Sequence, residues 1–305
     1  MNKQDNDNNI AIGNSDYDQV LFDSKQIVNG EVHSLTSGTS GSGKSYLTRT
    51  IIESLCINKL GTIVVIDPEG EYLSLRKLFD FVILGVDKDT CDILITEENA
   101  GSLATKMLEH KINMIIDLKY TDDHNRQEIA SNFINAVIDN SSPALCNSSP
   151  LQIVIDETSR FASKGVRSIA NIKCTGSLKR LIQFGRMREI STFYNTQRVT
   201  QLPADITCEC DTVIIGKCSN QIDIERNSRK IGLKNSSEIE SLKKYEFIAC
   251  GDGFVNGSFN RYVRFKSLTP KSEHGMKSSL ELQFKKLPKS ETVSKWIELM
   301  GVNNV

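Results

Sequence analysis

A glycine-rich segment near the N-terminus has the composition and spacing of a phosphate-binding loop. It reads GTSGSGKS and matches the pattern G-x-x-x-x-G-K-[ST] in full. Glycines let successive backbone N–H groups approach phosphate oxygens, because a Cβ would block the approach. In this pattern the lysine contacts the β- and γ-phosphates, and the final hydroxyl can ligate Mg²⁺. The predicted ATP-binding residues are Gly38, Thr39, Ser40, Gly41, Ser42, Gly43, Lys44 and Ser45, with Ser45 also a metal ligand.

Two apolar runs end in carboxylates that could act on a bound nucleotide. The run LQIVIDE ends in Asp156 and Glu157. The first acid can hold Mg²⁺, and the second can orient or deprotonate an attacking water. The run TIVVIDPEGEY carries Asp67, which the following proline holds extended at a strand end, where ligands bind in open α/β sheets. Either Glu157 or Asp67 could be the main catalytic acid.

The other acids near these runs have simpler interpretations. Glu71 is expected to cap the first turn of the next helix, where a carboxylate suits the helix dipole. Glu69 is expected to be a surface residue only. Asp117 ends the run INMIIDL, which has no second acid, so we interpret it as the end of a structural strand.

Polar and basic residues follow in the next part of the chain. The strand-like run STFYNTQR contains Gln197, a neutral amide that can hold water beside a γ-phosphate. Between Thr158 and Ile190 there are eight basic residues and one acid, a net charge of +7. Such a segment can bind a phosphate backbone, although it could equally be a solvated helix face.

These residues must be positioned by alternating strands and helices. Apolar runs of strand length alternate with amphipathic helical patterns from Val32 onward, which predicts a mainly parallel sheet with helices on both faces. Predicted helices include 45–57, 72–79, 100–110, 125–138, 168–184 and 222–231. We expect a disordered leader over 1–19 that leads into a short strand or turn, one main domain over 20–266, and a C-terminal tail over 267–305 that docks on a neighbouring subunit or is a loose end.

The composition is that of a globular protein. The chain has 305 residues, of which 39% are hydrophobic and 25% charged, with a net charge of −1. No apolar stretch approaches the roughly 20 residues that span a bilayer, so no membrane association is predicted. The polar N-terminal segment lacks an apolar signal core, which predicts a cytoplasmic protein.

The order of four motifs resembles a known group of motors. The segments GTSGSGKS, VVIDPEGEY, IVIDE and GRMREISTFYNTQR are similar to the HerA/FtsK superfamily of ATP-driven DNA translocases, and most similar to short HerA-like ATPases of phages and mobile elements. The resemblance runs from about His33 to Gly253. It implies a RecA-like (ASCE) P-loop NTPase core, Mg²⁺ and ATP at subunit interfaces, a homo-hexameric ring, and DNA, expected to be double-stranded, in the central channel.

The resemblance also ranks the candidate catalytic residues. It favours Glu157 as the base, with Asp156 on the metal and Asp67 as a second acid nearby. It implies that Arg186 is the arginine supplied to a neighbouring subunit's site, with Arg180, Arg188 and Arg198 as rivals. The expected function is a Mg²⁺-dependent ATPase that translocates phage or mobile-element DNA during packaging, recombination or transfer. The alternative is an ATP-dependent switch or assembly factor that does not move DNA.

Overall fold

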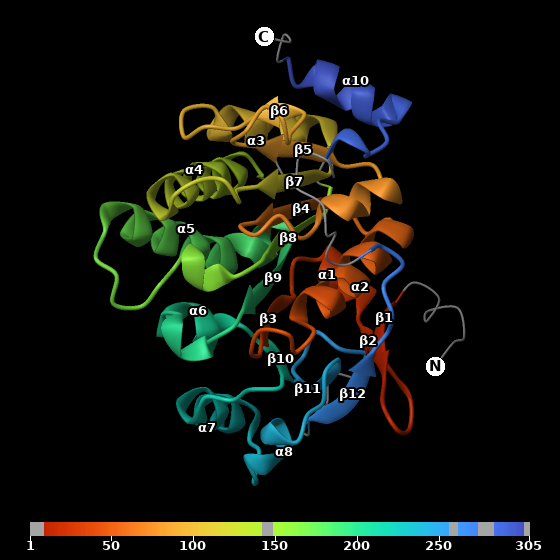
Figure 1. Cartoon of the computed structure of the whole chain (residues 1–305), viewed down its shortest axis with the longest axis vertical. Coiled ribbons are helices and arrows are strands. Elements are labelled where there is room, and N and C mark those ends of the chain that lie inside the picture. Colours follow the sequence, from red (N-terminus) through yellow and green to blue (C-terminus); the bar gives the residue numbers. More distant parts are fainter. Residues whose placement is uncertain (1–8, 142–148, 256–261, 274–283, 302–305) are drawn as a thin grey trace.

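The molecule is built on one large sheet (Figure 1). The computed structural model describes residues 9–141, 149–255, 262–273 and 284–301, and within them twelve strands lie in the order β2-β1-β12-β11-β10-β3-β9-β8-β4-β7-β5-β6. The strands are β1 (Ile10–Asn14), β2 (Gln19–Phe22), β3 (His33–Ser37), β4 (Thr62–Asp67), β5 (Val82–Gly85), β6 (Ile93–Leu94), β7 (Met114–Asp117), β8 (Leu151–Ile155), β9 (Ile190–Thr196), β10 (Thr212–Gly216), β11 (Glu246–Cys250) and β12 (Val263–Ser267).

Helices cover both faces of this sheet, as the alternating pattern predicts. They are α1 (Ser24–Val28), α2 (Lys44–Ile57), α3 (Ala100–His110), α4 (Asp123–Asn140), α5 (Ile169–Gly185), α6 (Ala204–Glu209), α7 (Gln221–Ile231), α8 (Ser237–Glu240) and α10 (Glu291–Leu299). Short 3-10 turns are η2 (Leu73–Lys77), η3 (Thr158–Arg160), η4 (Arg186–Arg188) and η5 (Val199–Gln201). None of the helices in the described part of the chain has the length and apolarity needed to span a bilayer.

The eight strands from β10 to β6 are parallel, and the remaining four, β2, β1, β12 and β11, pair antiparallel. The central strands β4, β7 and β8 are buried on both faces, which explains why their sequences are nearly continuous apolar runs. In β4, Val64 and Ile66 face a core shared with α3, α4 and α5, whereas Ile63 and Val65 face a core shared with α2. The α/β architecture with a mainly parallel sheet is therefore confirmed.

Part of the expected leader belongs to the sheet. Residues 10–14 form β1, in which Ile10 and Ile12 are buried, and β1 pairs antiparallel with β2 and β12. The expectation of a disordered leader is therefore wrong for these residues. Five residues in a polar context are too few to show a reliable strand pattern, and their partner β12 lies at the far end of the chain. Residues 1–8 lie outside the described residues.

The described part of the expected tail packs on its own chain. The segment 268–273, which we call the strap, follows β12 and runs along α2. Leu268 donates its N–H to the Ile12 carbonyl (3.0 Å), and the N–H groups of Lys271 and Ser272 both donate to the Glu53 carboxylate. Further on, α10 contacts α3 and β5, with Val293 buried. The described residues of the expected tail therefore pack against the main domain of their own chain.

Candidate nucleotide-binding site

The phosphate-binding loop lies between β3 and α2, at the carboxyl edge of the parallel strands. Gly41 and Gly43 have φ values of +77° and +107°, in the region that favours glycine. A Cβ on Gly43 would lie 2.6 Å from the Tyr245 ring, whereas one on Gly41 would meet nothing within 4 Å. The loop is held by its neighbours, because Thr39 donates its N–H to the Lys217 carbonyl at 2.8 Å. The open space at Gly41 and the adjacent start of α2 suit an anion.

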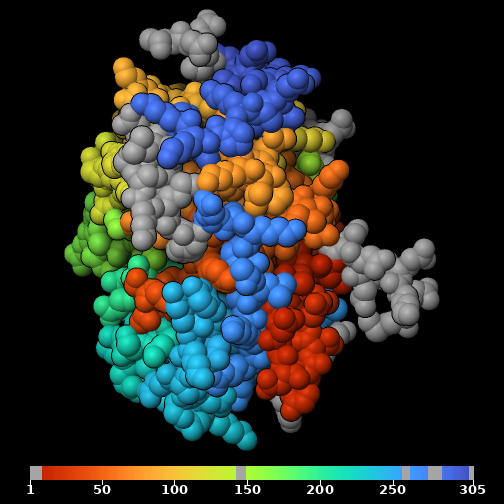
Figure 2. All heavy atoms as spheres, turned by 45° about the vertical axis from the view of Figure 1, so that its right-hand side comes forward, coloured from red at the N-terminus to blue at the C-terminus, as the bar shows by residue number. Residues whose placement is uncertain are grey.

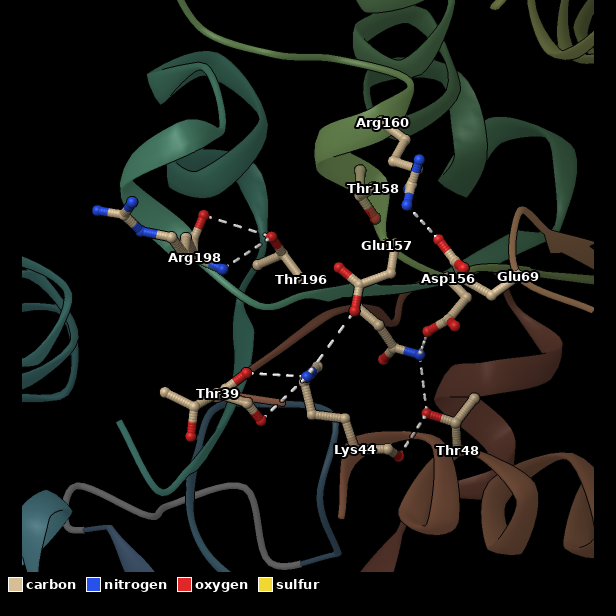
Figure 3. Close-up of polar contacts among 12 residues, drawn as sticks. Thr39, Lys44, Thr48, Glu69, Asp156, Glu157, Thr158, Arg160, Thr196 and Arg198 are labelled. Atoms are coloured by element: carbon tan, nitrogen blue, oxygen red, sulfur yellow. Dashed lines mark hydrogen bonds and ion pairs between the residues drawn. The ribbon is translucent and has the colours of Figure 1, made fainter. Parts of the chain in front are cut away.

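Lys44 and Glu157 face each other across this loop (Figure 3). The Lys44 ammonium is nearly buried and donates to the Gly38 carbonyl at 2.8 Å. Its Nζ lies 3.9 Å from Oε1 of Glu157. Glu157 has φ +40° and ψ +53°, a left-handed conformation that is uncommon for a residue other than glycine. Two predicted site residues from distant parts of the chain are thus brought together.

A buried amide connects Asp156 to the helix that follows the loop. Nδ2 of Asn195 donates to Oδ1 of Asp156 (2.9 Å) and to Oγ1 of Thr48 (2.8 Å), and Thr48 donates to the Lys44 carbonyl (3.0 Å). Burial, and then the charge of Glu157, raise the pKa of Asp156 to about 7. Sequence reasoning missed Asn195, although it stands two residues before Gln197 in the same quoted run.

Asp67 lies at the same edge but is turned into its own loop. Its carboxylate is fully buried and accepts three backbone N–H groups, from Glu69 (3.0 Å), Gly70 (2.8 Å) and Tyr72 (2.9 Å). Burial, and then the charges of Asp117 and Asp156, raise its pKa well above the usual range. Asp117 is next to it because β4 and β7 pair in register. Both Asp67 oxygens are thus engaged in shaping the loop that follows β4.

The two glutamates of that loop differ from expectation. The segment after Glu71 forms the 3-10 turn η2 instead of an α-helix, and no side chain caps it. Glu71 therefore does not act as a cap, and its Oε2 is buried with no hydrogen-bond partner in the described part of the chain. Oε1 of Glu69 pairs with Arg160 at 2.5 Å, so Glu69 joins the loops after β4 and β8 (Figure 3).

Gln197 lies beside the phosphate-binding loop, as predicted. It is exposed and lines a cavity of about 250 Å³ together with Thr39 and Ser40 of the loop. Arg198 lines the same cavity, and its Nε donates to Oδ2 of Asp223 at 3.3 Å. Arg198 is therefore held by α7, which makes it a weaker candidate for a residue that acts on another subunit.

Arg186 is not part of this site within one chain. It lies in η4, between the end of α5 and the start of β9, at the amino edge of the parallel strands. Its side chain is 76% exposed and pairs with Glu31 at 3.2 Å. This position follows from the topology, because α5 starts near the carboxyl edge of the sheet and carries the chain back to the amino edge, where Arg186 lies. Any contact between Arg186 and a nucleotide would have to be made in another subunit.

The basic segment is largely neutralised by acids on neighbouring elements. Five of its eight basic side chains form ion pairs: Arg160 with Glu69, Lys173 with Glu128, Lys179 with Asp205, Arg180 with Asp139 and Arg186 with Glu31. Lys164 and Arg167 lie exposed in the loop before α5, and no ion pair is seen for them within the described residues. The net charge counted along the sequence thus overstates the charge available to a partner.

The donors present fit a magnesium nucleotide. Ser45 at the start of α2 offers a hydroxyl and Asp156 a carboxylate, which are the hard oxygen ligands that Mg²⁺ prefers. Asp156 is buried and fixed by Asn195, so its position does not depend on a bound ion. The left-handed glycines provide the close backbone approach that phosphates require.

Comparison with known proteins agrees with this arrangement. Residues 10–142 match the family described as the central domain of the helicase HerA. The match covers 133 of the 305 residues, so this part of the chain is similar to the HerA central domain. A curated relative, the uncharacterized protein aq_aa31 of Aquifex aeolicus (strain VF5), is 44% identical over 70 residues, which are 23% of this chain and a quarter of that protein.

Three solved structures share the fold of this chain. The genome packaging NTPase B204 of Sulfolobus turreted icosahedral virus 2, in complex with ATP-gammaS, is 16% identical, with a TM-score of 0.52, over 78% of this chain and 98% of its own. VirB4 of Thermoanaerobacter pseudethanolicus gives a TM-score of 0.60 at 12% identity, over 86% and 97%. The pCW3 conjugation coupling protein TcpA gives 0.55 at 14% identity, over 94% and 73%. At these identities the likeness is one of fold.

Proposed function

We propose that this protein is a Mg²⁺-dependent ATPase that moves DNA. The observation that carries the proposal is the placement of Glu157 opposite Lys44 at 3.9 Å, beside a complete phosphate-binding loop. The similarity of residues 10–142 to the HerA central domain supports it, as do neighbours of the same fold whose names include genome packaging and conjugation. Packaging or transfer of phage or mobile-element DNA is the setting that the names of these neighbours favour, and we propose that it takes place in the cytoplasm.

Each residue of the site has a distinct task in this proposal. Lys44 leaves the Gly38 carbonyl and Glu157 to contact the β- and γ-phosphates, which frees the Glu157 carboxylate to orient and deprotonate the attacking water. Gln197 holds the same water from the side of the small cavity. Ser45 and Asp156 hold Mg²⁺, which neutralises charge on the phosphates when bound. Asp67 acts through the loop after β4 and not on the water.

The DNA contact is assigned to the loop before α5. Lys164 and Arg167 are the exposed basic residues of the former +7 segment for which no ion pair is seen in the described residues, and their loop follows β8 at the nucleotide edge. Contacts to phosphates make the DNA affinity fall as the salt concentration rises. The logarithm of the binding constant falls with the logarithm of the salt concentration, with a slope of about −0.9 per phosphate on duplex DNA. Double-stranded DNA in a channel formed by several subunits is the arrangement that we propose.

The experiment is a titration of ATPase rate with duplex DNA at low salt. We expect the rate to rise with DNA in the wild type, to rise less in a Lys164→Gln/Arg167→Gln variant, and to rise normally in a Lys173→Gln/Arg180→Gln control. Lys44→Ala should abolish turnover throughout. A rate that stays flat over the whole titration would instead support an ATP-dependent switch, the function favoured by the ion pairs that neutralise most of the basic segment.

A further inference from the structure

A second cavity lies at the opposite edge of the sheet from the phosphate-binding loop. It has a volume of about 720 Å³, which is within the range of small-molecule sites. Its walls come from the end of α2, the turn after η2, the residues that precede β4 and β7, and the segment 288–296 that includes the start of α10. In Figure 2 the blue C-terminal segment lies over the orange segments of this side of the molecule.

The lining of the cavity is basic. Five basic side chains and one acid, Asp80, line it, and the basic ones are Lys59, Arg76, Lys77, Lys111 and Lys289. Three of them have acidic partners, since Arg76 and Lys289 share Asp92 and Lys77 pairs with Glu273. For Lys59 and Lys111 no ion pair is seen in the described part of the chain. Lys59 and Lys111 are therefore the two basic side chains of the lining that have no acidic partner among the described residues.

Lys59 and Lys111 occupy equivalent places in the fold. Each follows a helix in a left-handed conformation, with φ values of +52° and +53°. Each is followed by a buried apolar residue whose N–H closes the helix end, Leu60 onto the Leu55 carbonyl (3.2 Å) and Ile112 onto the Met107 carbonyl (3.1 Å). The chain then enters β4 and β7, which are paired neighbours. The two lysines reach one cavity because two equivalent helix ends lead into adjacent strands.

Glycine is the usual residue at such a helix end, because it adopts a positive φ without strain. Here, however, two separate helix ends carry a lysine at the position that favours glycine, and both lysines line the same cavity. A strained residue is an observation from which a function can be inferred. The side chain's contribution here is its ammonium group.

We propose that this cavity binds a small phosphorylated molecule through Lys59 and Lys111. A phosphate oxyanion suits two ammonium groups as a charge-assisted hydrogen-bond acceptor. Trp296 and Phe79 also line the cavity and offer an aromatic surface to a ring attached to the phosphate. The site is separate from the ATP site, since it lies at the amino edge of the strands.

The chain contains a single tryptophan, so Trp296 reports on this cavity alone. The experiment follows its fluorescence in the full-length Lys44→Ala variant, in which the phosphate-binding loop is disabled. Pyrophosphate tests the phosphate alone, and a nucleoside monophosphate tests the phosphate with a ring. We expect a saturable change with at least one of these probes.

The matched variant is Lys59→Gly/Lys111→Gly in the same background. Glycine suits both backbone positions, so the fold should be kept, whereas the half-saturating concentration should rise at least tenfold. Lys234→Gln, an exposed lysine near α7, is the control and should not change the titration. An unchanged response in the glycine variant, or no response to either probe in the parent, would overturn the proposal. A response to an acidic peptide alone would likewise overturn it and assign the cavity to a protein partner.

Discussion

The unusual backbone of Glu157 gives the site its geometry. The residue directly follows Asp156 at the end of β8, and its left-handed φ turns the chain so that one acid is buried and fixed by Asn195 while the next faces Lys44. Left-handed conformations of residues other than glycine persist where the surrounding structure imposes them, and they cluster at functional sites.

Glu157→Gln should keep ATP binding and lower turnover by about 10²–10⁴, because an amide cannot accept the proton of the attacking water. A steady-state ATPase assay combined with a nucleotide-binding titration measures both. Glu189→Gln is a close control, since Glu189 also has a left-handed backbone (φ +56°) but lies at the amino edge. Comparable losses in the two variants would mean that the Glu157 effect is structural.

The raised pKa of Asp156 predicts that the stability of the folded protein depends on pH. Its pKa in the folded protein is raised to about 7 by burial, so the folded state binds a proton more tightly than the unfolded state does. The stability associated with this group is therefore fully present below its unfolded pKa and is lost as the pH rises through about 7. Asp156→Asn, which has no charge to bury, should gain free energy of unfolding relative to wild type on going from pH 5 to pH 8. Urea denaturation of both nucleotide-free proteins at both pH values measures their free energies of unfolding. A difference between variant and wild type that is the same at pH 5 and pH 8 would contradict the raised pKa of Asp156.

The sequence predicted which side chains lie together at the site, but it did not predict all of their hydrogen-bond partners. Lys44, Asp156, Glu157 and Gln197 follow parallel strands, whose carboxyl ends share one edge, so their meeting could be predicted. The partners of Asp67 could not be predicted, because they are amides whose positions depend on the path of a loop.

At the scale of elements, the strap ties the C-terminal segment to the helix of the phosphate-binding loop. Arg49 of α2 is fully buried and donates to Ser74 (2.7 Å) and Ser272 (3.1 Å). Glu53, one turn later, accepts the N–H groups of Lys271 and Ser272 and the Ser272 hydroxyl. The helix, the turn η2 and the strap are therefore parts of one polar network.

Glu53→Ala should destabilise the domain by about 1–3 kcal/mol for each buried donor left without a partner. Chemical denaturation with and without ATP measures the loss. Glu109→Ala is the control, because Glu109 is an exposed glutamate on α3. If the two variants unfold at the same denaturant concentration, the strap contributes nothing to stability.

Elements with a strong local pattern could be predicted, and those that depend on distant partners could not. The apolar runs of the parallel strands and the helices α2 and α5 follow the expected ranges closely. Helix 72–79 was expected from its apolar spacing, but the amides at its start bind Asp67, and only the 3-10 turn η2 forms. Likewise β1 depends on β12, about which a five-residue window says nothing.

For the whole molecule, the two edges of the sheet separate Arg186 from the nucleotide site of its own chain. A head-to-tail interface joins unlike surfaces and closes into a ring when the rotation permits. We therefore propose a homo-hexamer in which Arg186 of one subunit reaches the ATP of the next. Its planar guanidinium can meet two oxygens of the transferring phosphoryl group.

Arg186→Ala should bind ATP normally and lose about 10³–10⁵ in turnover. Mixed with the inactive Lys44→Ala variant it should regain part of the activity, because some interfaces then combine an intact loop with an intact arginine. Arg229→Ala, which changes an exposed arginine on α7, should behave as wild type. Inactive mixtures in which mass measurement confirms mixed rings would exclude this role for Arg186.

The pairing of β1 with β12 has a consequence for synthesis on the ribosome. Ile10 and Ile12 of β1 are synthesised long before their partner strand β12, which follows about 250 residues later in the chain. Until then an unpaired strand and the apolar side chains of the N-terminal hairpin are exposed, which is the condition under which nascent chains aggregate. The edge of this hairpin can therefore be completed only after β12 has been made, about 250 residues later.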